Sequence, residues 1–207
     1  SDAAWRIVAN GYTTCVETGM TTFADAYLSQ AGCVYYIDAD YNGLPAVVST
    51  ESAYERGALI YDDSIVYISD DGELFELSLG DAGNGRMIAQ DVASFAASAD
   101  GQYIYFIDGL GDVWVNNGKK STKLAENGQA VYVMKNGTAL ILTDYSFETG
   151  GSLYYSENGG NRHKIADGVM SVTLGVRSAE YSCTLSGVYT VYSSTNGKKF
   201  SVIFEDR

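Results

Sequence analysis

Residues 98–125 read SADGQYIYFIDGLGDVWVNNGKKSTKLA, and this stretch contains the turn and three strand-like runs of the repeat that decides the fold. A turn at 98–102 leads into the apolar run YIYFI at 103–107. A Gly-x-apolar-aromatic segment follows, GDVW at 111–114, and after an Asn-Gly turn comes KLA at 123–125. Runs rich in Tyr, Val and Ile that are bounded by Gly and Asn predict short β-strands joined by tight turns.

The same unit recurs along the chain. The third strands, most of which open with a basic residue, centre near residues 7, 47, 88, 124, 165 and 202, about 40 residues apart. A further apolar stretch precedes each unit, as at 92–97 and 130–134, so that each unit holds four strands. One four-stranded sheet cannot bury both of its faces, but sheets stacked around an axis bury them for each other. The spacing therefore predicts an all-β protein, a β-propeller of about five four-stranded blades.

The repeat occupies most of the chain, and we expect a single propeller domain over residues 1–207. Residues 6–11 look like a third strand without the rest of its unit. They either complete the last blade as a ring closure or belong to a further blade, in a truncated or six-bladed ring. Residues 12–22 read as an irregular insertion. A β-sandwich of about a dozen strands is the alternative architecture, and the regular period argues against it.

Composition and charge exclude several classes of protein. The 207 residues carry 13 basic and 26 acidic side chains, a net charge of −13, which argues against a nucleic-acid surface and against adsorption to an anionic membrane. No run of about 18 apolar residues is present, so we expect no membrane insertion by this chain. The first residues lack the pattern of a signal peptide, so a signal or anchor segment would lie upstream.

The cysteines and the histidine suggest no reactive centre. Three cysteines cannot form a disulfide framework, and an odd number leaves at least one thiol free. Cys33 and Cys183 lie in strand-like runs and are expected to be small buried apolar groups, while a Cys15–Cys33 bridge is left open. The only histidine, His163, falls in a polar turn, and no Ser/His/Asp triad can be assembled around it.

Residues 98–106, SADGQYIYF, resemble the Ser-Pro-Asp-Gly-Lys-x-Ile-x-Phe turn and strand of the WD-like repeats in the propeller domain of TolB and its bacterial relatives. Ala99 stands where that family usually has Pro. The Tyr- and Gly-rich repeat is also similar to propeller modules of uncharacterised surface proteins from Gram-positive bacteria. The resemblance implies a β-propeller at the cell surface or outside the cell, which serves as a binding platform more often than as an enzyme. It supplies no catalytic residues.

The clearest local motif, DADYNG at 38–43, begins like a calcium-binding loop. Oxygens of Asp38, Asp40 and Asn42 could converge on one cation. Ser49 stands where the closing carboxylate of such a loop is expected, so a plain polar turn is the alternative. Calcium is the one cofactor that the sequence suggests.

Propeller topology predicts which turns share a face. The turns between the first two runs of each unit and the links between units fall on one face, which we expect to be acidic. On that face, Asp70, Asp71, Asp108 and Asp112 are the candidate ligand-binding residues. The turns before the third strands fall on the opposite face and hold most of the basic residues: Arg86, Lys119, Lys120, Lys123, Arg162, Lys164, Lys198 and Lys199.

These observations favour a non-catalytic extracellular binding or scaffold module that recognises a protein, peptide or cell-envelope glycan through the acidic face. Two alternatives come from other classes. A carbohydrate-active hydrolase or lyase would use a central acidic pocket, since adjacent carboxylates such as Asp70 and Asp71 abound. A structural spacer domain would use the charge for solubility alone.

Overall fold

In the computed structural model of the chain, the repeat forms antiparallel sheets, and no helix occurs among the residues that the structure describes. Side chains are described over 66–68, 71–76, 85–98, 100–175, 177–184 and 187–206, and the remaining strands by their backbone alone. The strands are β1 (Trp5–Val8), β2 (Tyr12–Cys15), β3 (Thr21–Phe23), β4 (Ala26–Leu28), β5 (Val34–Tyr36), β6 (Ala46–Ser49), β7 (Ala58–Tyr61), β8 (Ser64–Ile68), β9 (Leu74–Ser78), β10 (Arg86–Ala89), β11 (Val92–Ala97), β12 (Ile104–Asp108), β13 (Val113–Asn116), β14 (Ser121–Ala125), β15 (Gly128–Val133), β16 (Thr138–Ser146), β17 (Gly150–Glu157), β18 (His163–Leu174), β19 (Ala179–Leu185), β20 (Val188–Ser194) and β21 (Ser201–Asp206).

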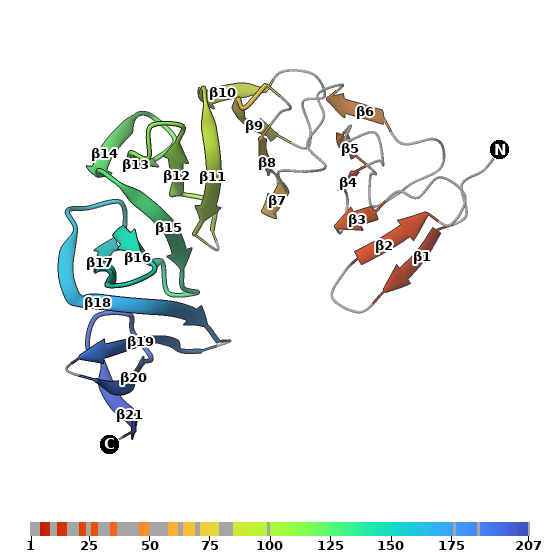
Figure 1. Ribbon diagram of the computed structural model, residues 1–207. Helices are drawn as coiled ribbons and strands as arrows, with labels where there is room; N and C mark the ends of the chain where they lie inside the picture. The colour runs from red at the N-terminus through yellow and green to blue at the C-terminus, as the bar shows by residue number, and fades with distance from the viewer. Residues whose placement is uncertain are drawn as a thin grey trace. The chain divides into compact units, whose positions relative to one another are not determined.

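Each sheet is a meander in which strands that follow one another in the sequence pair antiparallel (Figure 1). β1–β6, β7–β10 and β11–β14 form separate sheets, and β15–β21 form a seven-stranded one. The larger sheet arises because β18 pairs with β17 through its first half and with β19 through its second half. β18 therefore ends one four-stranded blade and begins the next. We name the blades after their second strands: the β8 blade (β7–β10), the β12 blade (β11–β14), the β16 blade (β15–β18) and the β19 blade (β18–β21).

The chain divides by its internal contacts into two compact units, Ser1–Val92 and Ala93–Arg207. The β12, β16 and β19 blades lie in the second unit, apart from the first residue of β11. Repeat proteins divide in this way because each repeat contacts mainly its neighbours. The organisation as a single propeller domain stays a prediction, as does the number of blades.

Several strand predictions are confirmed, and one prediction is wrong. The stretch predicted at 92–97 is β11, and KLA at 123–125 ends β14. Residues 12–22 are not an irregular insertion, because they contain β2 and the start of β3. Their threonines favour strands but hide the apolar alternation that marks one. The third strand predicted to centre near residue 202 corresponds to β21, which begins at Ser201 and is the fourth strand of its blade.

The N-terminal strand β1 was expected either to close the last blade or to belong to a further one. In the structure it pairs with β2, residue Trp5 opposite Cys15 and Val8 opposite Tyr12. β1 therefore belongs to the first sheet. Cys33 lies outside the described residues, so the Cys15–Cys33 bridge stays a prediction.

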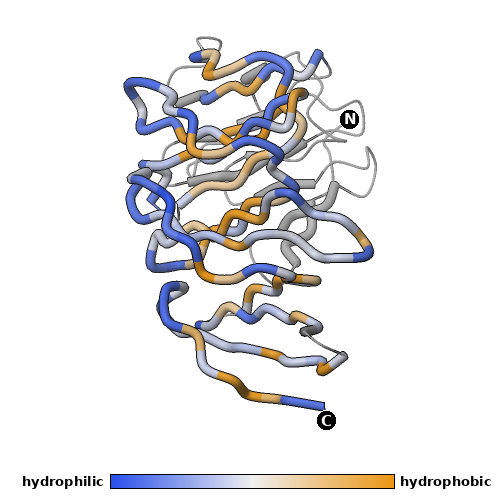
Figure 2. The backbone as a smooth tube through the Cα atoms, turned by 60° about the vertical axis from the view of Figure 1, so that its left-hand side comes forward, coloured by the Kyte–Doolittle hydropathy of each residue, from blue (hydrophilic) through white to orange (hydrophobic). Residues whose placement is uncertain are grey.

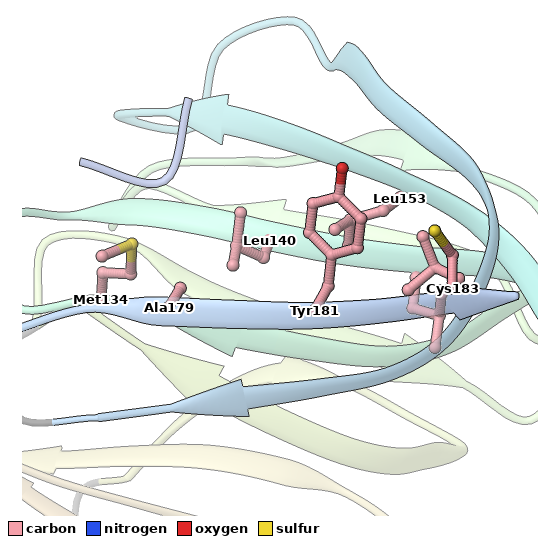
Figure 3. Close-up of a cluster of buried hydrophobic side chains, with 8 residues drawn as sticks. Met134, Leu140, Leu153, Ala179, Tyr181 and Cys183 are labelled. Atoms are coloured by element: carbon pink, nitrogen blue, oxygen red, sulfur yellow. The ribbon is translucent and has the colours of Figure 1, made fainter. Parts of the chain in front are cut away.

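The hydrophobic core of the second unit lies between successive blades. Leu140 and Leu153 of the β16 blade pack against Ala179, Tyr181 and Cys183 of β19 (Figure 3). All five side chains are buried, and Cys183 is a free thiol, as the sequence predicts. In Figure 2, hydrophobic residues lie mostly along the strands and hydrophilic ones mostly at the turns.

The outward face of the β19 blade differs from that of the blade before it. Leu140 and Leu142 of β16 point toward the following blade and are buried by it. In β19, where Tyr181 packs back onto the β16 blade, the alternate positions hold Glu180 and Ser182. Side chains alternate between the two faces of a strand. The face of the β19 blade that points away from the β16 blade is therefore more polar and buries less apolar area.

We expect this core to loosen at alkaline pH. Burial raises the pKa of Tyr181 to about 12, whereas the pKa of a tyrosine in the unfolded chain is about 10. The folded state holds the phenol neutral, so its contribution to stability is complete below about pH 10 and is lost as the pH rises toward about 12. Urea unfolding across this range should show the loss in the wild type and a smaller loss in Tyr181→Phe. Tyr189→Phe, at an exposed ring, is the control, and an equal effect of both variants would contradict the prediction.

Candidate functional site

The turn between the second and third strands of a blade meets the link into the next blade at a glycine. The carbonyl of Gly72 accepts a hydrogen bond from the N–H of Val92 at 2.8 Å, and that of Gly111 accepts one from Gly128 at 2.7 Å. Gly72 and Gly111 have φ angles of 82° and 83°, which side chains other than glycine's rarely tolerate. These are the glycines of the Gly-x-apolar-aromatic motif. Within the second unit, the motif therefore marks the point where the β12 blade is joined to the β16 blade, at one end of their strands.

Asp108 and Asp112 come together in the turn between β12 and β13. Oδ1 of Asp108 accepts hydrogen bonds from the backbone N–H groups of Leu110 at 3.0 Å and Asp112 at 2.9 Å. Its Oδ2 accepts one from the indole Nε1 of Trp114 at 2.8 Å. The carboxylate of Asp112 pairs with Nζ of Lys123 at 2.7 Å. Both aspartates thus have partners within the blade, and Asp108 in particular shapes its turn.

The other predicted site residues are not brought to this turn by any described contact. Asp71 is exposed in the turn between β8 and β9. Asp70 lies outside the described residues, as do Asp38, Asp40 and Asn42 of the calcium motif. Ligand binding by the four aspartates and calcium binding by the loop therefore stay predictions. In the described part of the chain, no group of three or more His, Cys, Asp or Glu side chains is arranged to hold a metal ion.

Sequence reasoning missed two residues that the structure places at the tips of these turns. Leu110, between β12 and β13, is 84% exposed, and Phe147, between β16 and β17, is 86% exposed. They occupy equivalent turns of consecutive blades. A signal was present, because each is a large apolar residue in a turn flanked by Gly or acidic residues, where no strand periodicity explains it.

A polar hollow of about 420 Å³ lies next to the link between the β12 and β16 blades. Two hydrogen bonds join Asn127 in the link to Asp144 near the end of β16. The N–H of Asp144 donates to the Asn127 carbonyl at 2.9 Å, and Nδ2 of Asn127 donates to the Asp144 carboxylate at 2.9 Å. The Asn127 amide, followed by the Thr143 hydroxyl, lowers the pKa of Asp144 and keeps it ionised. The charged lining consists of Lys123, Glu126, Asp144 and Arg162.

The basic residues at the start of β18 are held against aromatic rings. The guanidinium of Arg162 lies 4.5 Å from the ring centroid of Tyr154, and Nζ of Lys164 lies 6.0 Å from it. Such contacts stabilise a cation over the face of a ring. His163 is exposed, but it begins β18 rather than lying in a turn, and its ring stacks on Tyr155 with centroids 5.0 Å apart.

Comparison of the chain with models of known protein families and with curated proteins finds no match. Solved structures do share its fold. The chain is similar to the β-propeller domain of the trilobed protease from Pyrococcus furiosus, with a TM-score of 0.50 and 13% identity, over 71% of this chain and 56% of that one. It is similar to the N-terminal domain of Nup159, with a TM-score of 0.52 and 13% identity, over 87% of this chain and 59% of that one. It is also similar to BamB from Moraxella catarrhalis, with a TM-score of 0.53 and 14% identity, over 99% of this chain and 72% of that one.

The chain has the β-propeller fold, as its repeat and its family resemblance predict. It spans less than two thirds of the Nup159 domain and of the trilobed protease propeller. Propellers carry many unrelated activities, so function has to be argued from the side chains of this chain. No helix among the described residues has the length and hydrophobicity needed to cross a bilayer.

Proposed function

We propose that the chain is a non-catalytic binding module that captures a protein or peptide through the turns that carry Leu110 and Phe147. The observation behind this proposal is their exposure, 84% and 86%, at equivalent positions of consecutive blades. Covering such a side chain with a partner's surface contributes about 2 kcal/mol. A few large side chains of this kind commonly supply most of the binding energy of a protein interface.

The charges around these two anchors suggest the chemistry of the partner. Asp112 and Glu148 lie in the same turns, and Glu126 and Asp144 lie at the neighbouring link, all in a chain with a net charge of −13. Two cations offset part of this charge: Lys123 pairs with Asp112, and Arg162 lines the same hollow as Asp144. We infer that this end of the blades is the acidic, ligand-binding face. The partner would offer an apolar pocket surrounded by Lys or Arg side chains.

The proposal includes the setting that the resemblance implies. We infer a TolB-like bacterial propeller that works outside the cell or at its surface, where the partner is a protein or peptide rather than a glycan. Among the described residues, no arrangement of side chains favours the hydrolase alternative. The hydrogen bonds of Asp108 make it a poor residue for testing ligand binding, because replacing it disturbs the turn itself.

The test is the double variant Leu110→Ser, Phe147→Ser. Peptides are selected from a displayed random library on the wild-type protein, and their affinity for both proteins is measured by calorimetry. We expect the selected peptides to be rich in Lys, Arg and apolar residues, and to bind the double variant at least about tenfold more weakly.

The matched control is Ile203→Ser, at an exposed side chain of β21 that lies outside these turns. It should bind the selected peptides as the wild type does. Melting curves should be unchanged in both variants, because all three side chains are exposed. A selection that yields no basic, apolar peptides, or equal binding of such peptides to the double variant, would refute the proposed face.

A further inference from the structure

The opposite end of the blades contains a second hollow, between the β16 and β19 blades. Its volume is about 270 Å³, and it lies between the turn that follows β15 and the turn that follows β18. These turns join the first and second strands of their blades, so they are at the other end from Leu110 and Phe147. A hollow of this volume is near the lower limit of ligand sites and suits a group of about dipeptide size.

The hollow has an apolar part. Val133, Met134 and Leu174 line it. Met134 is buried under the neighbouring turn, and its flexible thioether can adapt to a guest. Leu174 is 37% exposed at the end of β18. A ligand with an apolar side chain would cover this leucine and gain by doing so.

Two cations flank the apolar part, Lys135 from one turn and Arg177 from the other. Both are exposed, and within the described residues neither forms an ion pair. Among the described residues, the lining includes no Asp or Glu, although acidic residues outnumber basic ones 26 to 13 in the chain. Two unpaired cations beside an apolar surface are complementary to a carboxylate next to an apolar side chain.

The pair of cations is particular to this hollow, because the equivalent hollow one blade earlier has a different pair of charges. It lies between the β12 and β16 blades, has a volume of about 200 Å³ and also includes Lys135. In place of a second cation, it contains Asp100. The Asp100 carboxylate accepts hydrogen bonds from the Ser98 hydroxyl at 2.6 Å and from the Gln102 N–H at 3.1 Å. These bonds, led by that from Ser98, lower the pKa of Asp100, so this hollow holds its own anion.

We propose that the hollow between the β16 and β19 blades is a binding site for an acidic peptide segment, in which Lys135 and Arg177 hold the carboxylates and Leu174 contacts an apolar side chain. Asn136 would form one wall of the site, because its side chain is already held by two hydrogen bonds. Its Nδ2 donates to the Asn196 carbonyl at 3.3 Å, and its Oδ1 accepts from the Thr138 N–H at 3.0 Å. This site is separate from the face proposed above and takes the opposite charge.

The experiment is an NMR titration of the ¹⁵N-labelled full chain with acetyl-Asp-Leu-Asp. Acetyl-Lys-Leu-Lys and acetyl-Asp-Gly-Asp are the comparison peptides. We expect saturable shifts of the amides of Met134, Lys135 and Arg177 with the acidic leucine peptide. Binding should be at least about tenfold weaker for the glycine peptide and absent for the basic one. The double variant Lys135→Ala, Arg177→Ala should bind at least about tenfold more weakly.

The matched control removes two other exposed cations, Lys119→Ala and Lys120→Ala, in a turn that does not line the hollow. It should bind as the wild type does. The proposal is overturned if the acidic peptide causes no saturable shift in the wild type, if the shifts lie elsewhere, or if both double variants weaken binding equally. None of these results depends on Leu110 or Phe147, so this test and that of the proposed function can fail separately.

Discussion

Replacing Leu140 with alanine is expected to destabilise the protein by about 2 to 5 kcal/mol. The side chain is fully buried, at 0% exposure, in the cluster between the β16 and β19 blades. Its neighbours belong to backbone ladders on both sides, β15 through the pair with Tyr132 and β17 through the pair with Tyr155. These ladders limit how far the structure can relax into the space left by the missing methyl groups. The loss should appear as a lower midpoint in urea unfolding followed by circular dichroism.

The same substitution at Leu110 is the control, because that side chain is 84% exposed and packs against little. Leu110→Ala should change the free energy of unfolding by less than about 0.5 kcal/mol. The two variants therefore separate stability from binding. We expect Leu140→Ala to lower stability and Leu110→Ala to weaken binding of the partner. An unfolding midpoint of Leu140→Ala within error of the wild type would contradict the packing of the two blades described above.

Replacing Gly150 with alanine should cost about 3 kcal/mol, for two reasons. The backbone φ of 69° costs a residue with a Cβ about 1 kcal/mol or more. In addition, the new Cβ would lie 2.6 Å from the carbonyl carbon of Gly168 and 2.7 Å from the carbonyl oxygen of Val169. These are backbone atoms of the link into the β19 blade, and moving them adds about 2 kcal/mol. The cost is measured as the change in the free energy of urea unfolding.

Gly111 separates these two causes, because it has the strained conformation without the crowding. Its φ is 83°, and the nearest atom to an added Cβ is the Cα of Asn127 at 3.9 Å. Gly111→Ala should therefore cost only about 1 kcal/mol. If the two variants cost the same, the close approach of the turn before β17 to the link at Gly168 does not contribute to stability.

The repeat made the strands and turns of the second unit predictable, because its signals are local. Gly111 indicates the turn in which it lies, and the apolar run at 103–107 predicts β12 to within one residue at each end. The pairing register of the last blade could not be predicted by the same reasoning. Val202 lies opposite Tyr192, where Lys164 lies opposite Tyr154 in the blade before. The position equivalent to Lys164 therefore holds Val202 rather than a basic residue, and only the pairing with β20 reveals it.

The candidate site was predicted less well than the fold. Topology placed Asp108 and Asp112 at the same turn, and the structure agrees. It could not show that the Trp114 indole, six residues along the chain and on the next strand, would occupy one oxygen of Asp108. Leu110 and Phe147 were overlooked because an apolar residue in the sequence is usually assigned to the core. Their exposure depends on how far each turn projects, which the sequence does not state.

The amino-acid sequence alone determined that this protein is an all-β repeat protein with the β-propeller fold, because strand periodicity and turn chemistry depend on residues a few positions apart. It also determined the net charge of −13 and the concentration of charged residues in the turns. Only the tertiary structure decided which charges are already paired and which apolar side chains are left exposed. Lys123 is paired with Asp112, whereas Lys135 and Arg177 flank a hollow whose described lining residues include no Asp or Glu. The physical reason is that pairing and burial are set by contacts between blades, which join residues far apart in the chain.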